Sequence, residues 1–291
     1  MLTCVLRFTL FASRSTSKCI RHTRRSLRKS DSVIQPEDVM KPLQSLFFIF
    51  CFLTLAIGCQ KNKEGANNEN AIIINDNNGD EYNPVIDPAN FVSAIDNPYF
   101  TLTPGRAWVY EGKNKAGKIE RVEVEVTRET KTILGVNATV VRDRAYKDGK
   151  LVEDTFDWFA QDKDGNVWYL GEDSKEIKDG EVVSTAGSWE AGVNGAKAGI
   201  IMKATPQVGD AHRMEFLKGS AEDMVEVLSI NETVNIGFGN YENCLKLKEW
   251  APLKPDLVEH KIYSKDVGNV VIEKKVAGGS GELELIEMKT H

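Results

Sequence analysis

The amino-acid sequence predicts a mostly β protein: an antiparallel sheet that forms a barrel, a half-barrel or a sandwich, with a short N-terminal helix. Three observations predict this class. Apolar and polar residues alternate in short runs after Pro98, turn residues separate these runs about every 8 to 12 residues, and no run keeps the 3.6-residue period of a long helix.

Residues 1–39 precede the predicted export signal and are interpreted as an upstream extension, with translation starting at Met40. They are rich in Arg, Lys, Ser and Thr and contain few acidic residues. That composition is also typical of an organelle transit peptide. Thr23 to Lys29 resembles a twin-arginine export signal, but Pro36 and nearby acidic residues separate it from the apolar run.

Residues 40–58 have the features of a signal peptide. The apolar run from Leu46 to Gly58 would span about 20 Å as a helix, less than the roughly 30 Å hydrocarbon layer of a membrane. Its end at Cys59 resembles the lipobox of bacterial lipoproteins, although Ala56 stands where that motif favours Leu. The resemblance implies cleavage after Gly58 and a lipid on the Cys59 sulfur. An ordinary secretory signal and an uncleaved anchor are the alternatives.

Residues 59–85 are interpreted as the lipidated start of the mature chain and an Asn-rich tether. Cleavage before Cys59 removes nine of the 37 Lys and Arg and three of the 43 Asp and Glu, which leaves 28 basic and 40 acidic residues. The resulting net charge of −12 disfavours nucleic-acid binding. Cys244 then remains without a disulfide partner, and we expect a small buried residue there and not a nucleophile.

Residues 86–291 are predicted to form a single β domain. Asp87 and Pro88 suit the start of a short helix that reaches towards Ile95. Ile119, Val122, Val124 and Val126 then alternate with charged residues, as in a strand with one wet face. Further strands follow, and the turns between them are predicted at Asp148-Gly149, Asp162 to Gly165 and Lys178 to Gly180.

The glycine-rich segment from Thr185 to Asp210 interrupts this rhythm and is predicted to be a long loop. In one interpretation it packs over an open end of the sheet through Trp189 and Ile201. In the other it is a lid over a ligand.

No cofactor and no metal are expected, because the patterns of nucleophile elbows, zinc proteases, paired cysteines and phosphate loops are missing from the sequence. One open alternative is a periplasmic hydrolase that uses carboxylates such as Asp157 and Glu190. Another is a metal or acid–base site in which His212 and His260 meet Glu249 or Asp157.

Aromatic residues are densest between Asp154 and Asp173. The period of a strand places Phe156, Trp158 and Ala160 on one face, with Asp157, Phe159 and Gln161 on the other. Core packing explains this pattern. A pocket for an apolar or ring-bearing ligand explains it as well, and the residues predicted to line such a pocket are Trp158, Trp168, Tyr169 and Trp189.

Four stretches together resemble a group of uncharacterised secreted or lipid-anchored bacterial proteins: IDNPYFTLTPGRAWVYEG, DTFDWFAQDKDGNVWYLGED, SWEAGVNGAKAGIIM and EHKIYSKDVGNVVIE. The last stretch is also similar to a strand pair of half-barrel proteins that carry lipoproteins. These resemblances imply a domain of the bacterial cell envelope, anchored to a membrane by lipid and facing the periplasm or the exterior. The expected function is non-enzymatic binding of an unknown small molecule or protein. The hydrolase and a carrier of a lipophilic ligand remain alternatives.

Overall fold

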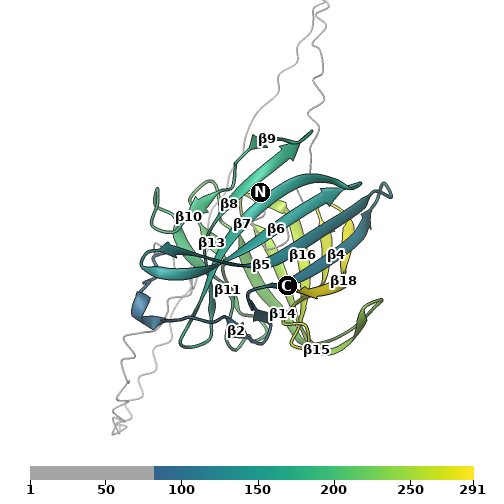
Figure 1. The fold of residues 1–291 in the computed structure, drawn as a ribbon. Helices are drawn as coiled ribbons and strands as arrows, with labels where there is room; N and C mark the ends of the chain where they lie inside the picture. Colours follow the sequence, from purple (N-terminus) through teal and green to yellow (C-terminus); the bar gives the residue numbers. More distant parts are fainter. Residues whose placement is uncertain (1–81) are drawn as a thin grey trace, which may run out of the picture. The chain divides into compact units, whose positions relative to one another are not determined.

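One antiparallel sheet of 16 strands dominates the computed structural model, which describes residues 82–291 (Figure 1). All of these residues belong to one compact unit. The predicted upstream extension, the signal peptide, Cys59 and most of the tether lie outside the described residues. No helix in the described part of the chain is long and apolar enough to cross a membrane.

The strands follow one another around the sheet almost in chain order. The order is β12, β14, β15, β16, β17, β18, β4, β5, β6, β7, β8, β11 and β13, and the short strands β1, β9 and β10 pair at the side with β7 or β8. The bounds of the long strands are β4 Arg106–Asn114, β5 Ile119–Ile133, β6 Val136–Lys147, β7 Lys150–Asp162, β8 Val167–Lys178, β14 Met224–Ile236, β15 Gly239–Ala251, β16 Lys254–Ser264, β17 Asn269–Ala277 and β18 Gly281–Thr290. The shorter strands are β1 Phe91–Val92, β9 Glu181–Ser184, β10 Trp189–Glu190, β11 Lys197–Met202, β12 Ala211–Arg213 and β13 Glu215–Phe216.

A single segment brings the two ends of this order together. β12 pairs with β14 at one end of the order, and β13 pairs with β11 at the other. Only Met214 separates β12 from β13 along the chain. The sheet is therefore a nearly closed antiparallel barrel, which confirms the predicted fold class.

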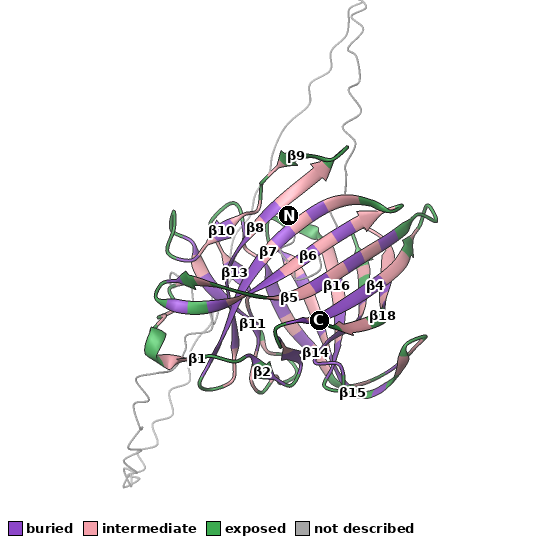
Figure 2. Ribbon diagram, viewed as in Figure 1, coloured by how far each residue is buried: buried purple, intermediate pink, exposed green. Residues whose placement is uncertain are grey.

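Side chains alternate between the inside and the outside of the barrel. Figure 2 shows buried and half-buried residues in alternation along β5, β6 and β7. On β5 the buried residues Val122, Val124 and Val126 share the inner face with Glu120, whereas Ile119 is 43% exposed on the outer face. The sequence analysis placed Ile119 with the three valines, and the register shows that Glu120 takes that inner position instead.

The predicted Asp-Gly turns are present. β6 and β7 are joined by Asp148 and Gly149, whose φ angles of 49° and 76° are both positive. β8 and β9 are joined in the same way by Asp179 and Gly180, with φ angles of 53° and 88°. Two positive φ angles match the turn that suits the twist of a hairpin.

Two local predictions need correction. The helix expected from Asp87 is one 3₁₀ turn, η1 (Pro88–Asn90), capped by the Asp87 side chain, and the chain then enters β1. The segment 185–210 is not a long loop, because it contributes β10 and the barrel strand β11. Gly199 permits this, since a side chain there would meet the Met214 backbone at 2.3 Å.

A small hairpin fills one end of the barrel. It consists of β2 (Asp96–Asn97) and β3 (Phe100–Thr101), which form a separate two-stranded sheet. Gln161 Oε1 on β7 accepts both backbone N–H groups of β2, at 2.9 Å each. Thr101 N–H donates to the Gly268 carbonyl in the turn between β16 and β17 (2.8 Å). We call residues 95–102 the plug.

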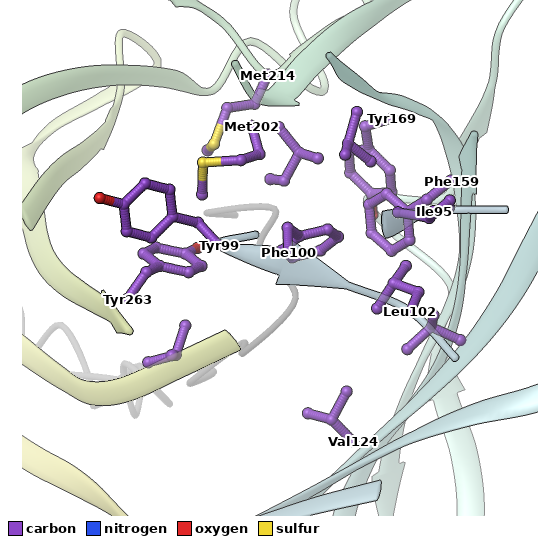
Figure 3. Close-up of a cluster of buried hydrophobic side chains, with 14 of the residues drawn as sticks. Ile95, Tyr99, Phe100, Leu102, Val124, Phe159, Tyr169, Met202, Met214 and Tyr263 are labelled. Carbon is purple, nitrogen blue, oxygen red and sulfur yellow. The ribbon is translucent and has the colours of Figure 1, made fainter. Parts of the chain in front are cut away.

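The plug supplies the apolar centre of the core. Phe100 is fully buried and meets the Phe159 ring edge-on at 5.3 Å. Figure 3 shows Phe100 in the middle of the cluster, with Met202 and Met214 on one side and Phe159 and Tyr169 on another. Because hairpin turns alternate between the two ends of an antiparallel barrel, the opposite end is the one bounded by the turns at Asp148 and Gly278.

Candidate functional site

The inside of the barrel carries far more acidic than basic side chains. Eleven Asp and Glu residues of the described chain are buried, but Lys261 is the one Lys or Arg buried with them. An isolated buried charge is strongly unfavourable, so such an excess of carboxyl groups requires protonation or pairing with cations.

Seven of these buried acidic residues form a group towards the end of the barrel opposite the plug, and we call this group the acidic cluster. Asp223 is included because its charge acts on Glu259. Each member of the cluster is at most 6% exposed. Its members come from both halves of the chain: Glu120, Asp143, Glu153, Asp223, Glu249, Glu259 and Glu273.

The strand register explains how these side chains meet. One row of neighbours across the inner face runs from Lys261 to Glu273, Leu283, Gly112, Glu120 and Lys147. Glu249 and Glu259 are opposite each other in the adjacent row. Directly opposite residues have Cβ atoms about 5 Å apart, so Glu249 and Glu259 are close neighbours.

Lys261 is paired inside the acidic cluster. Its Nζ atom lies 2.8 Å from Glu249 Oε2 and 3.6 Å from Glu273 Oε2, and all three side chains are at most 2% exposed. Burial lowers the pKa of Lys261 to about 8, and the Glu273 carboxylate opposes this shift.

Burial also controls the ionisation of the carboxyl groups. It raises the pKa of Glu249 well above the ordinary value, and the neighbouring Glu273 raises it further. The pKa of Glu259 is likewise raised by burial and by Glu273, against the attraction of Lys275. Burial raises the pKa of Glu273 as well, and Lys261 opposes it. At these three residues burial therefore favours the protonated form over the ionised one.

Two tyrosines border the acidic cluster. Tyr110 and Tyr263 are fully buried, and the Tyr110 hydroxyl donates to the Val270 carbonyl at 3.1 Å. The Tyr263 hydroxyl has no hydrogen-bond partner among residues 82–291. Burial raises its pKa well above the ordinary value, and the nearby Glu249, Glu273 and Tyr110 contribute.

The structure does not bring the two predicted histidine ligands together. His212 is buried on the inner face, where Val225 separates it from Glu249 in the register. His260 pairs in register with Lys248 on the opposite face of the sheet, and its pKa is lowered by burial and by flanking lysines. In the described chain, no three Asp, Glu, His or Cys side chains are arranged to hold a metal ion.

Two of the predicted site residues meet on the outer face of the barrel. Trp158 and Glu190 flank Gly171 in the register. Lys131 connects them, because its ammonium lies 3.3 Å from the centre of the Trp158 ring and 2.7 Å from Glu190 Oε2. Trp158 is 7% exposed beneath this lysine.

Trp168 also lies on the outer face, but under the N-terminal segment. Its ring meets Phe91 edge-on at 6.4 Å, and its Nε1–H donates to Asp162 Oδ2 at 2.8 Å. The same Asp162 caps the turn between β7 and β8 through the backbone of Asp164 and Asn166.

Tyr169, Trp189 and Asp157 come together on the inner face. Tyr169 stacks on Phe159 at 4.8 Å and meets Trp189 edge-on at 5.2 Å. Its hydroxyl donates to Asp157 Oδ1 at 2.5 Å. Asp157 and Glu190 are thus on opposite faces of the sheet, so the register does not place them beside each other. A ligand-lining role for the four aromatic residues remains a prediction.

A separate pocket of about 430 Å³ opens on the outer face of β4, β5 and β6. None of the predicted lining residues contributes to it. Its lining is Glu111, Ile119, Arg121, Glu123, Tyr146, Asp148 and Gly149. The charges are paired with one another, since Arg121 contacts Glu123 at 3.0 Å and Glu111 at 3.7 Å, and Lys118 contacts Asp148 at 3.2 Å.

Sequence reasoning missed the acidic cluster, although a signal for it exists. Glu249 follows Leu245 and Leu247 at the spacing of one strand face, and Glu120 precedes Val122 and Val124 in the same way. An acidic residue that stands two positions from the apolar residues of a strand lies on the same face as they do, so it is predicted to face the core.

The fold and the interior define a nearly closed β-barrel with an apolar plugged end and an acidic end. No protein-family model and no curated protein matches the chain. Among solved structures, the chain is similar to a protein from Bacteroides fragilis described as a proposed exported protein with a YmcC-like fold. The identity is 15%, the TM-score is 0.39, and the match covers 66% of this chain and 99% of that one.

Two further structures are similar. A proposed lipoprotein from Parabacteroides distasonis matches at 12% identity and a TM-score of 0.32, covering 66% of this chain and 98% of that one. A β-barrel-like protein of domain of unknown function DUF1849 from Brucella abortus matches at 13% identity and a TM-score of 0.41, covering 65% and 98%. These descriptions agree with the bacterial proteins expected from the sequence resemblance. At such identities and TM-scores they assign no function.

Proposed function

We propose that the protein is a non-enzymatic binding domain of the bacterial cell envelope, held to a membrane by lipid on Cys59, and that its ligand binds at the acidic end of the barrel. The supporting observation is the concentration of buried acidic side chains there: seven carboxyl groups, with Lys261 as the one fully buried Lys or Arg of the described chain. A polar interior of this kind is unfavourable for folding alone, which favours a functional role.

The carrier of a lipophilic ligand is less well supported by this geometry. Phe100, Leu102 and the other plug residues already occupy the apolar end of the barrel. At the other end an acyl chain would contact polar carboxyl groups in place of an apolar wall. Organic extraction of the purified protein followed by mass spectrometry tests this alternative, because a carrier would release acyl chains in amounts comparable to the protein.

The hydrolase alternative is tested by Asp157→Asn. Asp157 is fully buried and accepts the Tyr169 hydroxyl, so a structural role predicts a change in stability without any turnover to lose. Loss of a hydrolytic activity with folding intact would support the enzyme instead.

The binding proposal is tested by a thermal-shift screen of the full chain against small polar molecules, with Glu249→Gln as the site variant. A true ligand should raise the melting temperature of the wild type and much less that of the variant. Glu226→Gln is the matched control, because Glu226 is on the outer face and pairs with Lys248 at 3.0 Å. Equal shifts in all three proteins would place the binding elsewhere.

The membrane proposal is tested by mass spectrometry of the protein purified from its native membrane. The proposal predicts that the mature chain begins at a Cys59 bearing acyl chains. Two or three acyl chains would hold it stably to a bilayer. An unmodified Cys59 still joined to Gly58 would contradict the anchor.

A further inference from the structure

We infer that a small apolar surface beside the start of the described chain docks on the membrane that carries the protein, and thereby fixes which side of the barrel faces the bilayer. Docking rests on the lipid anchor proposed above and adds a second membrane contact to it. Four exposed residues form this surface, which we call the root patch: Val85 (85% exposed), Pro88, Leu134 (46%) and Val193 (47%). Exposed apolar residues that are scattered singly need no explanation, but a group of four does.

The segments that form the root patch touch one another. Gly135 lies against Pro88, because a side chain at Gly135 would meet the Pro88 ring at 2.9 Å. Leu134 lies over Gly192, where a side chain would meet Leu134 Cδ2 at 2.5 Å. Val193 follows directly in the chain. Pro88, Leu134 and Val193 therefore adjoin on the surface, although they come from three distant parts of the sequence.

The root patch lies where the predicted tether enters the domain. The Tyr82 hydroxyl donates to the Ala198 carbonyl at 2.7 Å, and the Tyr82 ring meets Phe216 edge-on at 5.8 Å. These contacts hold the chain against β11 and β13 three residues before Val85. The 22 residues between Cys59 and Tyr82 would span about 25 Å as a random coil. An anchored Cys59 would therefore keep the root patch within reach of the bilayer.

Leu134 is an unusual residue for its turn. Its φ angle is 50° and that of Gly135 is 81°, as in the turns at Asp148-Gly149, Asp179-Gly180 and Asn194-Gly195. Those three turns begin with Asp or Asn, which the left-handed conformation tolerates, whereas a leucine is disfavoured there. A leucine at this position weakens the turn and exposes an apolar side chain, so its use favours a contact outside the domain.

The charges around the root patch also suit a membrane. The net charge of −12 of a chain that starts at Cys59 would be repelled by anionic lipids. The segments that form the patch carry two lysines and two acidic residues, which are Lys131, Lys197, Asp87 and Glu190. Lys131 and Glu190 pair at 2.7 Å. The patch is therefore apolar and locally neutral, which suits the boundary between lipid headgroups and acyl chains.

The test uses a fluorescent dye on the root patch of the full, lipid-bearing chain, bound to vesicles of phosphatidylethanolamine and phosphatidylglycerol. Val193→Cys carries the dye, because Cys244 is buried and Cys59 would be lipidated. Lipids with brominated acyl chains should quench this dye. The control is the same dye at Leu253→Cys. Leu253 is 43% exposed in the turn between β15 and β16, at the end of the barrel opposite the plug, and a dye there should not be quenched.

Leu134→Asn in the dye-labelled protein is the decisive variant, since asparagine suits a left-handed turn and keeps the fold intact. It should shift the equilibrium between docked and undocked states about threefold or more towards the undocked state, and so reduce the quenching without lowering the free energy of unfolding. Leu253→Asn should change neither quantity. Quenching that Leu134→Asn leaves unchanged, or equal quenching at the two dye positions, would overturn docking through the root patch.

Co-sedimentation with the same vesicles, with mass spectrometry of Cys59, separates docking from the anchor. If Cys59 bears no acyl chain and the protein stays in solution, the proposed anchor fails and docking fails with it. If the lipid-bearing protein sediments with the vesicles but the dye is not quenched, the anchor stands and docking fails. If the detergent-solubilised protein is a dimer that Leu134→Asn separates, the root patch joins two copies of the chain, and membrane docking is overturned.

Discussion

The two ends of the barrel interior contain chemically different side chains, although the same strands form both ends. At the plug end Phe100 meets Phe159, Met202 and Met214, and the core is apolar. At the other end Lys261 sits among Glu249 and Glu273. Apolar burial stabilises a fold at any pH, whereas buried ionisable groups make stability depend on protons. The comparison predicts that the plug end contributes the same stability at every pH, whereas the contribution of the acidic end changes with pH.

The largest effect is expected at the plug. Phe100→Ala removes a fully buried ring and should lower the free energy of unfolding by about 3–5 kcal/mol, equally at pH 5 and pH 8. Urea denaturation of the full chain measures this. Phe238→Ala is the control, because Phe238 is 41% exposed in the turn between β14 and β15 and should change stability by less than about 0.5 kcal/mol. A strongly pH-dependent loss at Phe100 would contradict the division into two ends.

The next effect is expected at Lys261. Lys261→Met removes the buried cation between Glu249 and Glu273 and should destabilise the protein by up to about 3 kcal/mol at pH 8. The loss should shrink at pH 5, because protonated carboxyl groups no longer need the ammonium. Adding Glu249→Gln to this variant should recover part of the stability. A loss that does not vary with pH would assign Lys261 to packing alone.

The stability of the wild type should depend on pH through two kinds of buried group, the glutamates with a raised pKa and His212 with a lowered pKa. The pKa values of Glu249, Glu259 and Glu273 lie above the ordinary 4.5, so their contribution is fully present below pH 4.5 and is lost as the pH rises through the raised values. His212 acts in the other direction. Burial and Lys203 lower its pKa from 6.5 to about 4, against Asp210 and the Ile200 carbonyl.

The contribution of His212 is therefore present above pH 6.5 and is lost as the pH falls to about 4. The lowered pKa of His212 corresponds to about 3 kcal/mol of stability. Urea denaturation between pH 4 and pH 9 should show stability falling on both sides of a maximum. His212→Leu should remove most of the fall on the acid side and leave the alkaline side unchanged. If both variant and wild type lose the same stability in acid, His212 is not the cause.

The smallest effect is expected for exposed ion pairs on the outer face. Lys274 and Glu282 are 2.6 Å apart, but their side chains are 57% and 38% exposed. Solvent screens such pairs, so Lys274→Ala should change the free energy of unfolding by at most about 0.5 kcal/mol. A loss comparable to that of Lys261→Met would show that burial does not decide the value of a charge in this barrel.

Local patterns in the sequence were sufficient for the fold class and for the Asp-Gly turns, since alternation and turn chemistry are properties of neighbouring residues. They failed for Thr185 to Asp210, where glycines suggested a loop. Gly199 is there because β11 passes close to the Met214 backbone, and that contact depends on barrel closure.

Local sequence patterns could not predict the candidate site either, because it too depends on how distant strands pair in the closed barrel. Glu120, Glu249 and Glu273 are far apart in the chain, and only the register of β5, β15 and β17 within the barrel brings them onto one face. Aromatic density pointed to Trp158 and Trp168 instead, which the register directs outward.

The most direct test of the central claim is the protonation state of Glu249. Carbon-13 NMR titration of the side-chain carboxyl groups in the full chain, with Glu249→Gln to assign the signal, measures it. The account predicts that Glu249 remains protonated well above pH 4.5 in the free protein. A Glu249 carboxyl group that is already ionised at pH 4.5 in the free protein would contradict it.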